Sequence, residues 1–264
     1  KKGASRVRTV LLVHHLTGWE RMGERAPVLR FLREVSCVRS SDAVVTTGPW
    51  AQTRLIPLLQ KGGECFTVEP GADRLDASPA SGSEHGRSHA PIELLFVGGL
   101  SRRKRIVELA RLVSETEGVR LTIVGQPREP DVAALVSEIA SASPAADPRI
   151  VFVGEVDDEE LTRRIRASDA LVLPSELEGY GMVVTEALYL GTPALVSNES
   201  GLPFAVVDGV NARTFAFPEL AGILAELVRD RTELLRLRAG ALRSRASLPT
   251  WAHQGELFRA VLRG

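Results

Sequence analysis

The chain has 264 residues, of which 44% are hydrophobic, enough for one large domain or two modest ones. Its 33 lysines and arginines equal its 33 aspartates and glutamates, which argues against a general nucleic-acid binder, because such proteins carry a basic excess. No apolar run approaches the ~18 residues needed to cross a bilayer, so we expect no transmembrane segment.

The first residues, "KKGASRVRTVLLVHHL", are basic and then apolar. Their apolar core, "VLLV", is shorter than the ~7–15 residues of a signal peptide, so we predict a strand instead. Cys37 and Cys65 lack the spacing of metal ligands, and we interpret them as reduced, partly buried thiols. We therefore expect a cytoplasmic protein, and peripheral contact with the inner face of the membrane stays open.

Strands and helices alternate over residues 1–75, which implies a parallel sheet. We predict strands over 8–14, 43–48 and 64–73, and helices over 24–42 and 49–63. The first helix carries Leu29, Leu32 and Val35 at helical spacing. Three strands are fewer than such a sheet normally has, so we expect a partial N-terminal domain that lacks its opening units.

Residues 76–91 are rich in Ser, Gly, Ala and Pro and are predicted to form a linker or exposed loop. His85 and His89 lie on this segment four positions apart. We favour an ordinary exposed pair over a metal site there, because a disordered loop is a poor frame for metal ligands.

From Ile92 the alternation is stronger and predicts a doubly wound α/β domain over 92–248. The expected strands are 92–100, 119–127, 149–156, 170–175 and 192–197, with a short hairpin-like piece over 205–215. The expected helices are 104–118, 131–143, 158–169, one or two within 218–247, and a last helix within 249–264. Packing of this last helix back on the N-terminal domain is one option.

In an open parallel sheet, ligands bind at the carboxyl ends of the strands. The stretch "FVGGLSRRKR" ends a strand at Gly98 and Gly99, and Arg102, Arg103 and Lys104 follow. Glycines let the backbone approach a phosphate, and cations bind it. Basic residues oppose the dipole at a helix start, so we favour an anion site over a merely solvated helix start.

A second stretch, "SELEGYGMVVTEAL", follows the strand "ALVLPS". Gly179 and Gly181, on either side of Tyr180, lie where the strand gives way to a helix, so their N–H groups can face a diphosphate. Glu178 precedes them on the loop, and Glu186 lies in an apolar part of the helix, where a carboxylate needs partners. The vicinal hydroxyls of a sugar would supply two donors.

Two further strand ends are weaker candidates. The polar loop from Ser197 to Gly201 either lines the same cleft or is an ordinary connection. His14 and His15 end the first strand and point to opposite faces of the sheet, so one of them is a candidate for the active site.

Together the stretches "FVGGLSRRK", "VFVGEV", "DALVLPSELEGYGMVVTEALYLGTPALVS" and "GLPFAVVDG" resemble, in order and spacing, the family 4 retaining glycosyltransferases. The two glutamates separated by seven residues, Glu178 and Glu186, match that family's hallmark. The resemblance covers nearly all of residues 92–264, and residues 8–75 look like the back half of the N-terminal domain. It implies an α/β protein of GT-B fold, with two Rossmann-like domains of which the N-terminal one is incomplete.

The resemblance also implies roles for individual residues. Glu186 would hold the ribose of a nucleotide-sugar, and Glu178 would contact the transferred sugar. Lys104, with Arg103, would bind the diphosphate, and the backbone near Val153 would hold the base. His15, or else His14, would match the active-site histidine. The implied catalytic residues are His15, Glu178 and Lys104, and the implied donor-binding residues are Gly98, Gly99, Arg103, Lys104, Val153, Glu178, Gly179, Tyr180, Gly181 and Glu186.

The expected function is transfer of a hexose, with retention, from a nucleotide-sugar to a glycan, lipid or small-molecule acceptor. No Asp-X-Asp ends a strand, so we expect no metal and no other cofactor. The chain departs from the family at Gly99, where an arginine is common and where Arg102 or Arg103 would compensate, and at Phe204, where a glutamate is common. A GT-B sugar epimerase and a non-catalytic donor-binding remnant are the alternatives.

Overall fold

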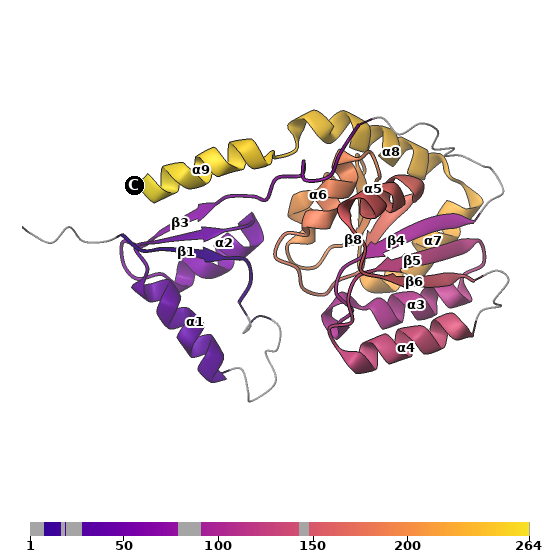
Figure 1. Ribbon diagram of the computed structural model, residues 1–264, viewed down its shortest axis with the longest axis horizontal. Coiled ribbons are helices and arrows are strands. Elements are labelled where there is room, and N and C mark those ends of the chain that lie inside the picture. Colours follow the sequence, from indigo (N-terminus) through magenta and orange to yellow (C-terminus); the bar gives the residue numbers. More distant parts are fainter. Residues whose placement is uncertain (1–7, 17–18, 20–27, 79–90, 143–147, 264) are drawn as a thin grey trace, which may run out of the picture.

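The computed structural model of the chain describes residues 8–16, 19, 28–78, 91–142 and 148–263. Within these residues the strands form two parallel sheets, one of three strands in the order β1-β2-β3 and one of six in the order β6-β5-β4-β7-β8-β9. Figure 1 shows the two sheets side by side, each with helices packed against it. The predicted α/β architecture with parallel sheets is confirmed.

The smaller half contains β1 (Val10–Val13), α1 (Val28–Ser40), β2 (Ala43–Thr46), α2 (Pro49–Leu55) and β3 (Glu64–Thr67). The second helix is shorter than predicted. It passes at Ile56 into a 3-10 turn that contains Pro57, and a proline lacks the N–H that would continue an α-helix.

The buried face of α1 includes Val35, as predicted, but not the other two predicted residues. Leu29 and Leu32 are 75% and 56% exposed, whereas Val35 and Val38 are buried and Phe31 packs against the core of the smaller half. Positions 31, 35 and 38 also have helical spacing, so the pattern of apolar residues fitted two faces. The packing of Phe31 against the sheet selects the second face.

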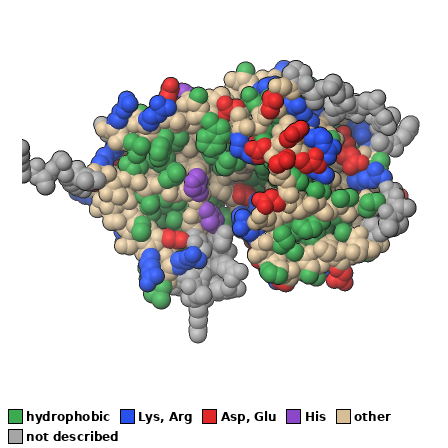
Figure 2. Space-filling model, viewed as in Figure 1, with side chains coloured by type: hydrophobic (Ala, Val, Ile, Leu, Met, Phe, Trp, Pro, Cys, Tyr) green, Lys and Arg blue, Asp and Glu red, His purple; other side chains and the backbone are tan. Residues whose placement is uncertain are grey.

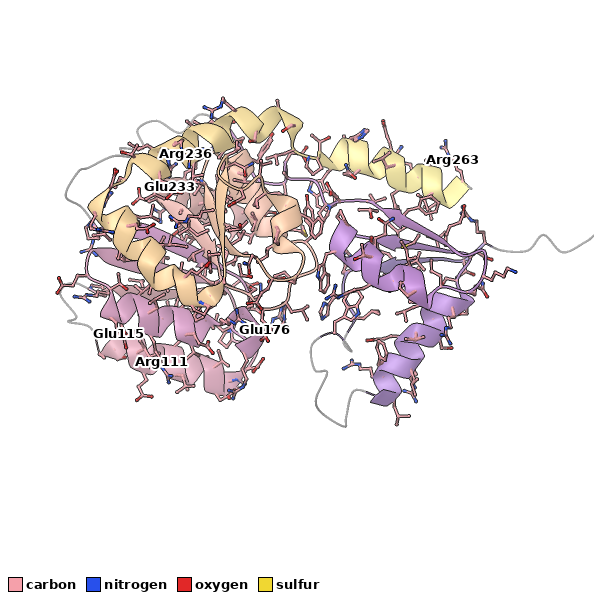
Figure 3. The ribbon with its side chains drawn as sticks, turned by 180° about the vertical axis from the view of Figure 1, so that it is seen from behind. Arg111, Glu115, Glu176, Glu233, Arg236 and Arg263 are labelled. Carbon is pink, nitrogen blue, oxygen red and sulfur yellow. The ribbon has the colours of Figure 1, made fainter. Side chains whose placement is uncertain are left out.

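The elements of the larger half follow the predicted alternation. They are β4 (Ile92–Val97), α3 (Ile106–Glu115), β5 (Val119–Val124), α4 (Pro130–Ser141), β6 (Ile150–Gly154), α5 (Asp158–Ala167), β7 (Ala170–Leu173), α6 (Met182–Tyr189), β8 (Ala194–Ser197), β9 (Ala212–Phe215), α7 (Leu220–Arg229) and α8 (Thr232–Ser244). Seen from behind, the helices carry charged side chains on their outer faces, as the labelled Arg111 and Glu115 of α3 show (Figure 3).

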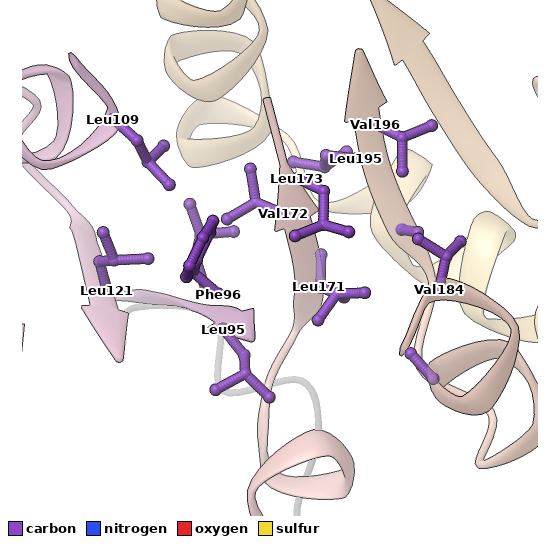
Figure 4. Close-up of a cluster of buried hydrophobic side chains, with 14 of the residues drawn as sticks. Leu95, Phe96, Leu109, Leu121, Leu171, Val172, Leu173, Val184, Leu195 and Val196 are labelled. Carbon is purple, nitrogen blue, oxygen red and sulfur yellow. The ribbon is translucent and has the colours of Figure 1, made fainter. Parts of the chain in front are cut away.

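The core of the larger half lies between the sheet and these helices. Every residue of β7 and β8 is buried, as the continuous apolar runs of strands covered on both faces predict. Figure 4 shows the two faces of the central strands: Leu95 and Leu171, which pair across β4 and β7, lie on one face, and Phe96 and Val172 lie on the other. Burial of each such side chain contributes about 1.5–3 kcal/mol, which fixes the carboxyl ends of the central strands relative to one another.

The prediction of a hairpin-like piece over 205–215 is wrong. Residues Ala212–Phe215 form β9, which pairs parallel with β8 at the edge of the sheet, with Ala194 opposite Ala212. The turn before it is closed by Asn211, whose buried side-chain oxygen accepts the N–H of Val207 at 2.8 Å. This local bond lets a short turn precede a parallel strand.

The last helix, α9 (Trp251–Arg263), lies alongside the smaller half in Figure 1. The N–H of Trp251 donates to Asp73 Oδ1 at 2.7 Å, and the side chain of Arg8 bonds the carbonyl of Val261. The helix therefore contacts both the segment after β3 and the start of β1. The expected domain limits themselves stay predictions.

Candidate functional site

The order of the larger sheet reverses between β4 and β7, and the turns that leave these two strands form the centre of the site. After β4 the backbone turns at Gly98, which has a φ of 151°. A Cβ there would lie 2.7 Å from Lys104 Nζ, so the glycine makes room for the ammonium group beside the backbone. Lys104 itself ends a short 3-10 turn, Arg102–Lys104.

Lys104 meets the loop after β7 through an ion pair. Its Nζ lies 2.6 Å from Glu178 Oε1, and the two side chains are 12% and 13% exposed. Arg103 lies 3.6 Å from the other oxygen of Glu178 and donates to the carbonyl of Leu177 at 2.6 Å. Burial raises the pKa of Glu178, but the charges of Lys104 and Arg103 outweigh it and hold that pKa below its usual range.

The loop after β8 lies against this cluster. Ser200 Oγ accepts the N–H of Glu178 at 2.8 Å, and the N–H of Gly201 donates to the carbonyl of Glu178 at 2.9 Å. The polar loop from Ser197 to Gly201 therefore contacts the stretch that carries Glu178, and the interpretation of it as a lining of the same site fits this geometry.

The loop after β7 also touches the smaller half. A Cβ at Gly179 would lie 2.6 Å from the carbonyl oxygen of His14, directly after β1. Tyr180 is buried and its hydroxyl donates to the carboxylate of Glu69, which follows β3. Burial and the charge of Glu69 raise the pKa of Tyr180, and burial raises that of Glu69. The carboxyl ends of the two sheets thus face each other.

Figure 2 shows a hollow where the two halves meet, with histidine side chains on one side and charged side chains on the other. His14 is exposed at the end of β1, and the ring of His15 packs edge-on against Trp19 at a centroid distance of 5.8 Å. Both candidate histidines therefore lie at the carboxyl end of the smaller sheet. The choice between them stays open.

The second glutamate, Glu186, is buried in α6 with 2% of its surface exposed. Its Oε1 accepts a hydrogen bond from Arg74 Nε at 2.7 Å, and Arg74 Nη1 also bonds Asp158 at the start of α5. The expectation that this carboxylate needs partners is met here by an arginine.

Val153 is half-buried near the carboxyl end of β6. The N–H of Gly125, at the end of β5, donates to the carbonyl of Gly154 at 2.8 Å, so the ends of these strands lie side by side. Val153 therefore lies along the same edge of the sheet as Gly98 and Gly99.

Three residues around the site were not predicted from the sequence: Glu69, Arg74 and Arg128. The side chain of Arg128, from the loop after β5, covers Gly99, with its Cγ 2.5 Å from the position that a Cβ would take. Among the described residues no acid pairs with Arg128. The apolar spacing of the sequence carried no signal for these contacts, because each joins segments far apart in the chain.

The basic turn is not uniformly free for a ligand. Arg102 is exposed and pairs with Glu129 and Asp131 on the start of α4. Arg103 bonds the loop after β7, as described above. Among the described residues, Arg102 and Arg103 therefore have acidic partners, whereas Arg128 has none.

Several other candidates gain no support as sites. His85 and His89 lie outside the described residues. In the described part of the chain, no three His, Cys, Asp or Glu side chains are grouped so that they could hold a metal ion. Both cysteines are free, and Cys37 is exposed rather than partly buried as expected. Across residues 8–16, 19, 28–78, 91–142 and 148–263, no helix is both long and apolar enough to span a membrane.

Comparisons with known proteins agree on one group. A family model described as "Glycosyl transferases group 1" matches residues 80–243. Glycogen synthase of Mycobacterium tuberculosis is 32% identical over 215 residues, which cover 79% of this chain and 50% of the relative. D-inositol 3-phosphate glycosyltransferase of Nocardia farcinica is 30% identical over 249 residues, 87% of this chain and 54% of the relative. The chain thus spans about half the length of these curated relatives.

Solved structures resemble the chain over nearly its whole length. Sucrose-phosphate synthase from Thermosynechococcus elongatus superimposes with a TM-score of 0.79 at 22% identity, covering 96% of this chain and 68% of the other. Anabaena HepE in complex with UDP and glucose gives 0.78 at 18% identity, covering 97% and 71%. At these identities the likeness bears on the fold alone, and it confirms the GT-B type expected from the sequence.

Proposed function

The chain belongs to the group 1 glycosyl transferases, and from this membership we propose that it moves a hexose from a nucleotide-sugar to a glycan, lipid or small-molecule acceptor, with retention of the anomeric configuration. The observation that carries the proposal is the pair of Lys104 and Glu178, which meet at 2.6 Å where the strand order reverses. Open α/β sheets bind their ligands at this point. The UDP complex of Anabaena HepE supports a nucleotide as the ligand.

The proposed roles follow from charge and burial. Lys104, Arg103 and Arg128 are cations that can neutralise a diphosphate, beside the backbone of Gly98 and Gly99. Departure of a nucleoside diphosphate from the sugar leaves negative charge on the phosphate, and fixed cations lower the barrier to that step. Ionised Glu178 is acceptor-only, so it suits the hydroxyls of the transferred sugar.

The remaining parts of the donor have candidate partners along the same edge. We assign the ribose hydroxyls to Glu186 and the base to the backbone near Val153. The acceptor would enter from the smaller half, where His15 or His14 ends β1. Gly179, Tyr180 and Gly181 form the loop that separates the two glutamates, and their backbone would face the diphosphate.

We further propose that the transfer needs no metal ion, because protein cations are available at the expected diphosphate position. The test is the initial rate of transfer after treatment with EDTA, followed by addition of Mg²⁺ or Mn²⁺. An unchanged rate supports the proposal. A rate that is lost with EDTA and restored by the metal contradicts it.

The function itself is tested by incubating the protein with UDP-, GDP- and ADP-hexoses and following nucleotide release with and without candidate acceptors. Release that depends on an acceptor, with a product heavier by one hexose in mass spectrometry, is the expected result. A change of sugar configuration without an acceptor would indicate an epimerase. Binding without release would indicate a donor-binding remnant, and absence of binding would overturn both readings.

A further inference from the structure

Glu186 is buried, and the residue that neutralises it comes from outside the six-stranded sheet. Its Oε1 accepts from Arg74 Nε at 2.7 Å, although the two residues are separated by 112 positions in sequence. A buried carboxylate without a partner is costly, and a charge-assisted hydrogen bond offsets that cost. No residue that the structure describes bonds the second oxygen, Oε2, so Arg74 occupies only one side of the carboxylate.

Arg74 lies on a segment that is fixed on both sides. The N–H of Ala72 donates to the carbonyl of Pro249 at 2.7 Å, and Asp73 accepts from Trp251 at 2.7 Å. Leu75 is buried in the core of the larger half. The backbone of Arg74 is therefore held between α9 and that core, which makes its side chain a defined support for Glu186.

The far end of the guanidinium is fixed as well. Arg74 Nη1 bonds the carboxylate of Asp158, in the first turn of α5. The planar fork of an arginine has a fixed direction for each N–H, so two acids at its two ends determine its orientation. Asp158 and the buried face of α6 thus set where Arg74 Nε points.

We infer that Arg74 is a positioning residue for the donor: it orients Glu186, with Oε1 bound to the arginine and Oε2 left to accept a ribose hydroxyl. This inference rests on the proposed function, in which Glu186 binds the ribose. Arg74 acts through Glu186 and need not touch the nucleotide. The alternative, that Arg74 takes the place of the ribose until the donor displaces it, predicts the opposite effect of its removal.

The test uses whichever of UDP, GDP and ADP binds the wild type most tightly. For each variant, the affinity for this nucleoside diphosphate is divided by the affinity for its 2′,3′-dideoxy analogue. The ratio of the two affinities isolates the contribution of the ribose hydroxyls. In Arg74→Gln we expect this ratio to fall about 10-fold, the lower end of the range for a hydrogen bond to a charged group. The affinity for the dideoxy analogue should change little, whereas a merely structural defect would lower the affinity for both ligands.

Further variants separate the outcomes. Arg74→Gln combined with Glu186→Gln should reduce the ratio no further than Glu186→Gln alone, since Arg74 acts through that carboxylate. Arg74→Lys keeps the charge without the fork, so it should fall between the wild type and Arg74→Gln, and it serves if Arg74→Gln does not fold. Arg163→Gln, which removes an exposed arginine paired with Glu160, is the matched control and should behave as wild type.

Three results would overturn the inference while leaving the proposed function standing. Both affinities could stay as in wild type in Arg74→Gln and Arg74→Lys. Both could fall equally, which leaves the ratio unchanged and indicates a merely structural defect. The ratio could also rise, as competition with the ribose predicts. If the wild type binds none of the three nucleoside diphosphates, the proposed function fails instead. The two failures are therefore distinguishable.

Discussion

Lys104 offers the most informative substitution, because it contacts an acid in the donor-free protein and is assigned to the diphosphate in the bound one. Lys104→Met removes the ammonium group and keeps most of the aliphatic stem beside Gly98. The substitution leaves Glu178 with Arg103, 3.6 Å away, as its remaining cation. Two consequences follow, one for ligand binding and one for stability.

The loss of binding free energy in Lys104→Met can be estimated from the attraction between the lysine and a phosphate. Two unit charges about 4 Å apart attract by about 4 kcal/mol at an effective dielectric constant of ~20. Part of this is lost because Lys104 must loosen its 2.6 Å pair with Glu178 to reach a phosphate. We therefore expect a loss of about 1.5–3 kcal/mol, or roughly 10- to 150-fold in Kd for a nucleoside diphosphate.

The loss of stability in Lys104→Met can be estimated from the burial of the ion pair between Lys104 and Glu178. Removing one partner of a buried ion pair costs about 3–5 kcal/mol, and the remaining Arg103 reduces this to about 2 kcal/mol. Binding must accordingly be measured well below the unfolding temperature of the variant. Lys61→Met, which changes an exposed lysine in the turn before β3, is the control for loss of a positive charge alone.

The assay is calorimetric titration with a nucleoside and with its diphosphate. Lys104→Met should lose affinity for the diphosphate and retain its affinity for the nucleoside within about twofold, since a nucleoside has no phosphate to bind. Equal losses for the two ligands would refute the reasoning. So would a wild-type protein that binds both ligands equally.

Three other predictions concern stability and titration. Gly181→Ala should lower the free energy of unfolding, measured in urea, by about 1–3 kcal/mol, because φ is 85° there and an added Cβ would lie 2.5 Å from a leucine methyl. The control, Gly222→Ala in α7, meets open space and should not destabilise the protein, so equal effects of the two substitutions would contradict the prediction. The pKa of Glu178 is below its usual range, so its ion pair contributes stability above the pKa of the unfolded carboxyl, and this contribution is lost as the pH falls through the lower pKa of the folded state. The free energy of unfolding of wild type should therefore exceed that of Glu178→Gln by less at about pH 3 than at about pH 6. A difference that stays constant with pH would contradict the prediction. Tyr180→Phe should raise the pKa of Glu69 further in an NMR titration, since the hydroxyl bond favours the ionised carboxylate, and an unchanged titration would contradict that bond.

Much of the larger half was predictable from residue patterns. Its strands are nearly continuous apolar runs followed by glycines or polar loops, which mark parallel strands buried on both faces. The same patterns predicted that Gly98 and Glu178 lie at the carboxyl ends of strands, with Glu186 in the helix that follows. The order of strands then brings Lys104 to Glu178, because β4 and β7 are neighbours.

The errors arose where local pattern was ambiguous. In α1 two apolar faces had helical spacing, and only the packing of Phe31 against the sheet distinguishes them. A hairpin-like piece was predicted over 205–215, because a parallel edge strand and a hairpin strand have the same residue preferences. The buried bond of Asn211 to Val207 is what closes the turn before β9.

The missed partners share a different cause. Arg74 with Glu186, and Arg128 with Gly99, join residues that are remote in sequence, and each depends on how the segments pack. Periodicity describes which face of an element is buried, and it carries no information on which distant side chain arrives there. Such contacts require the three-dimensional structure.

In the proposed function, a nucleotide binds along the carboxyl edge of the six-stranded sheet with its ribose on Glu186. The most direct measurement is the affinity of wild type and Glu186→Gln for a nucleoside diphosphate. Loss of a hydrogen bond to a charged group of about 1.5–3 kcal/mol predicts roughly 10- to 150-fold weaker binding in the variant. An affinity that is the same in a correctly folded Glu186→Gln would contradict the assignment of the ribose to Glu186.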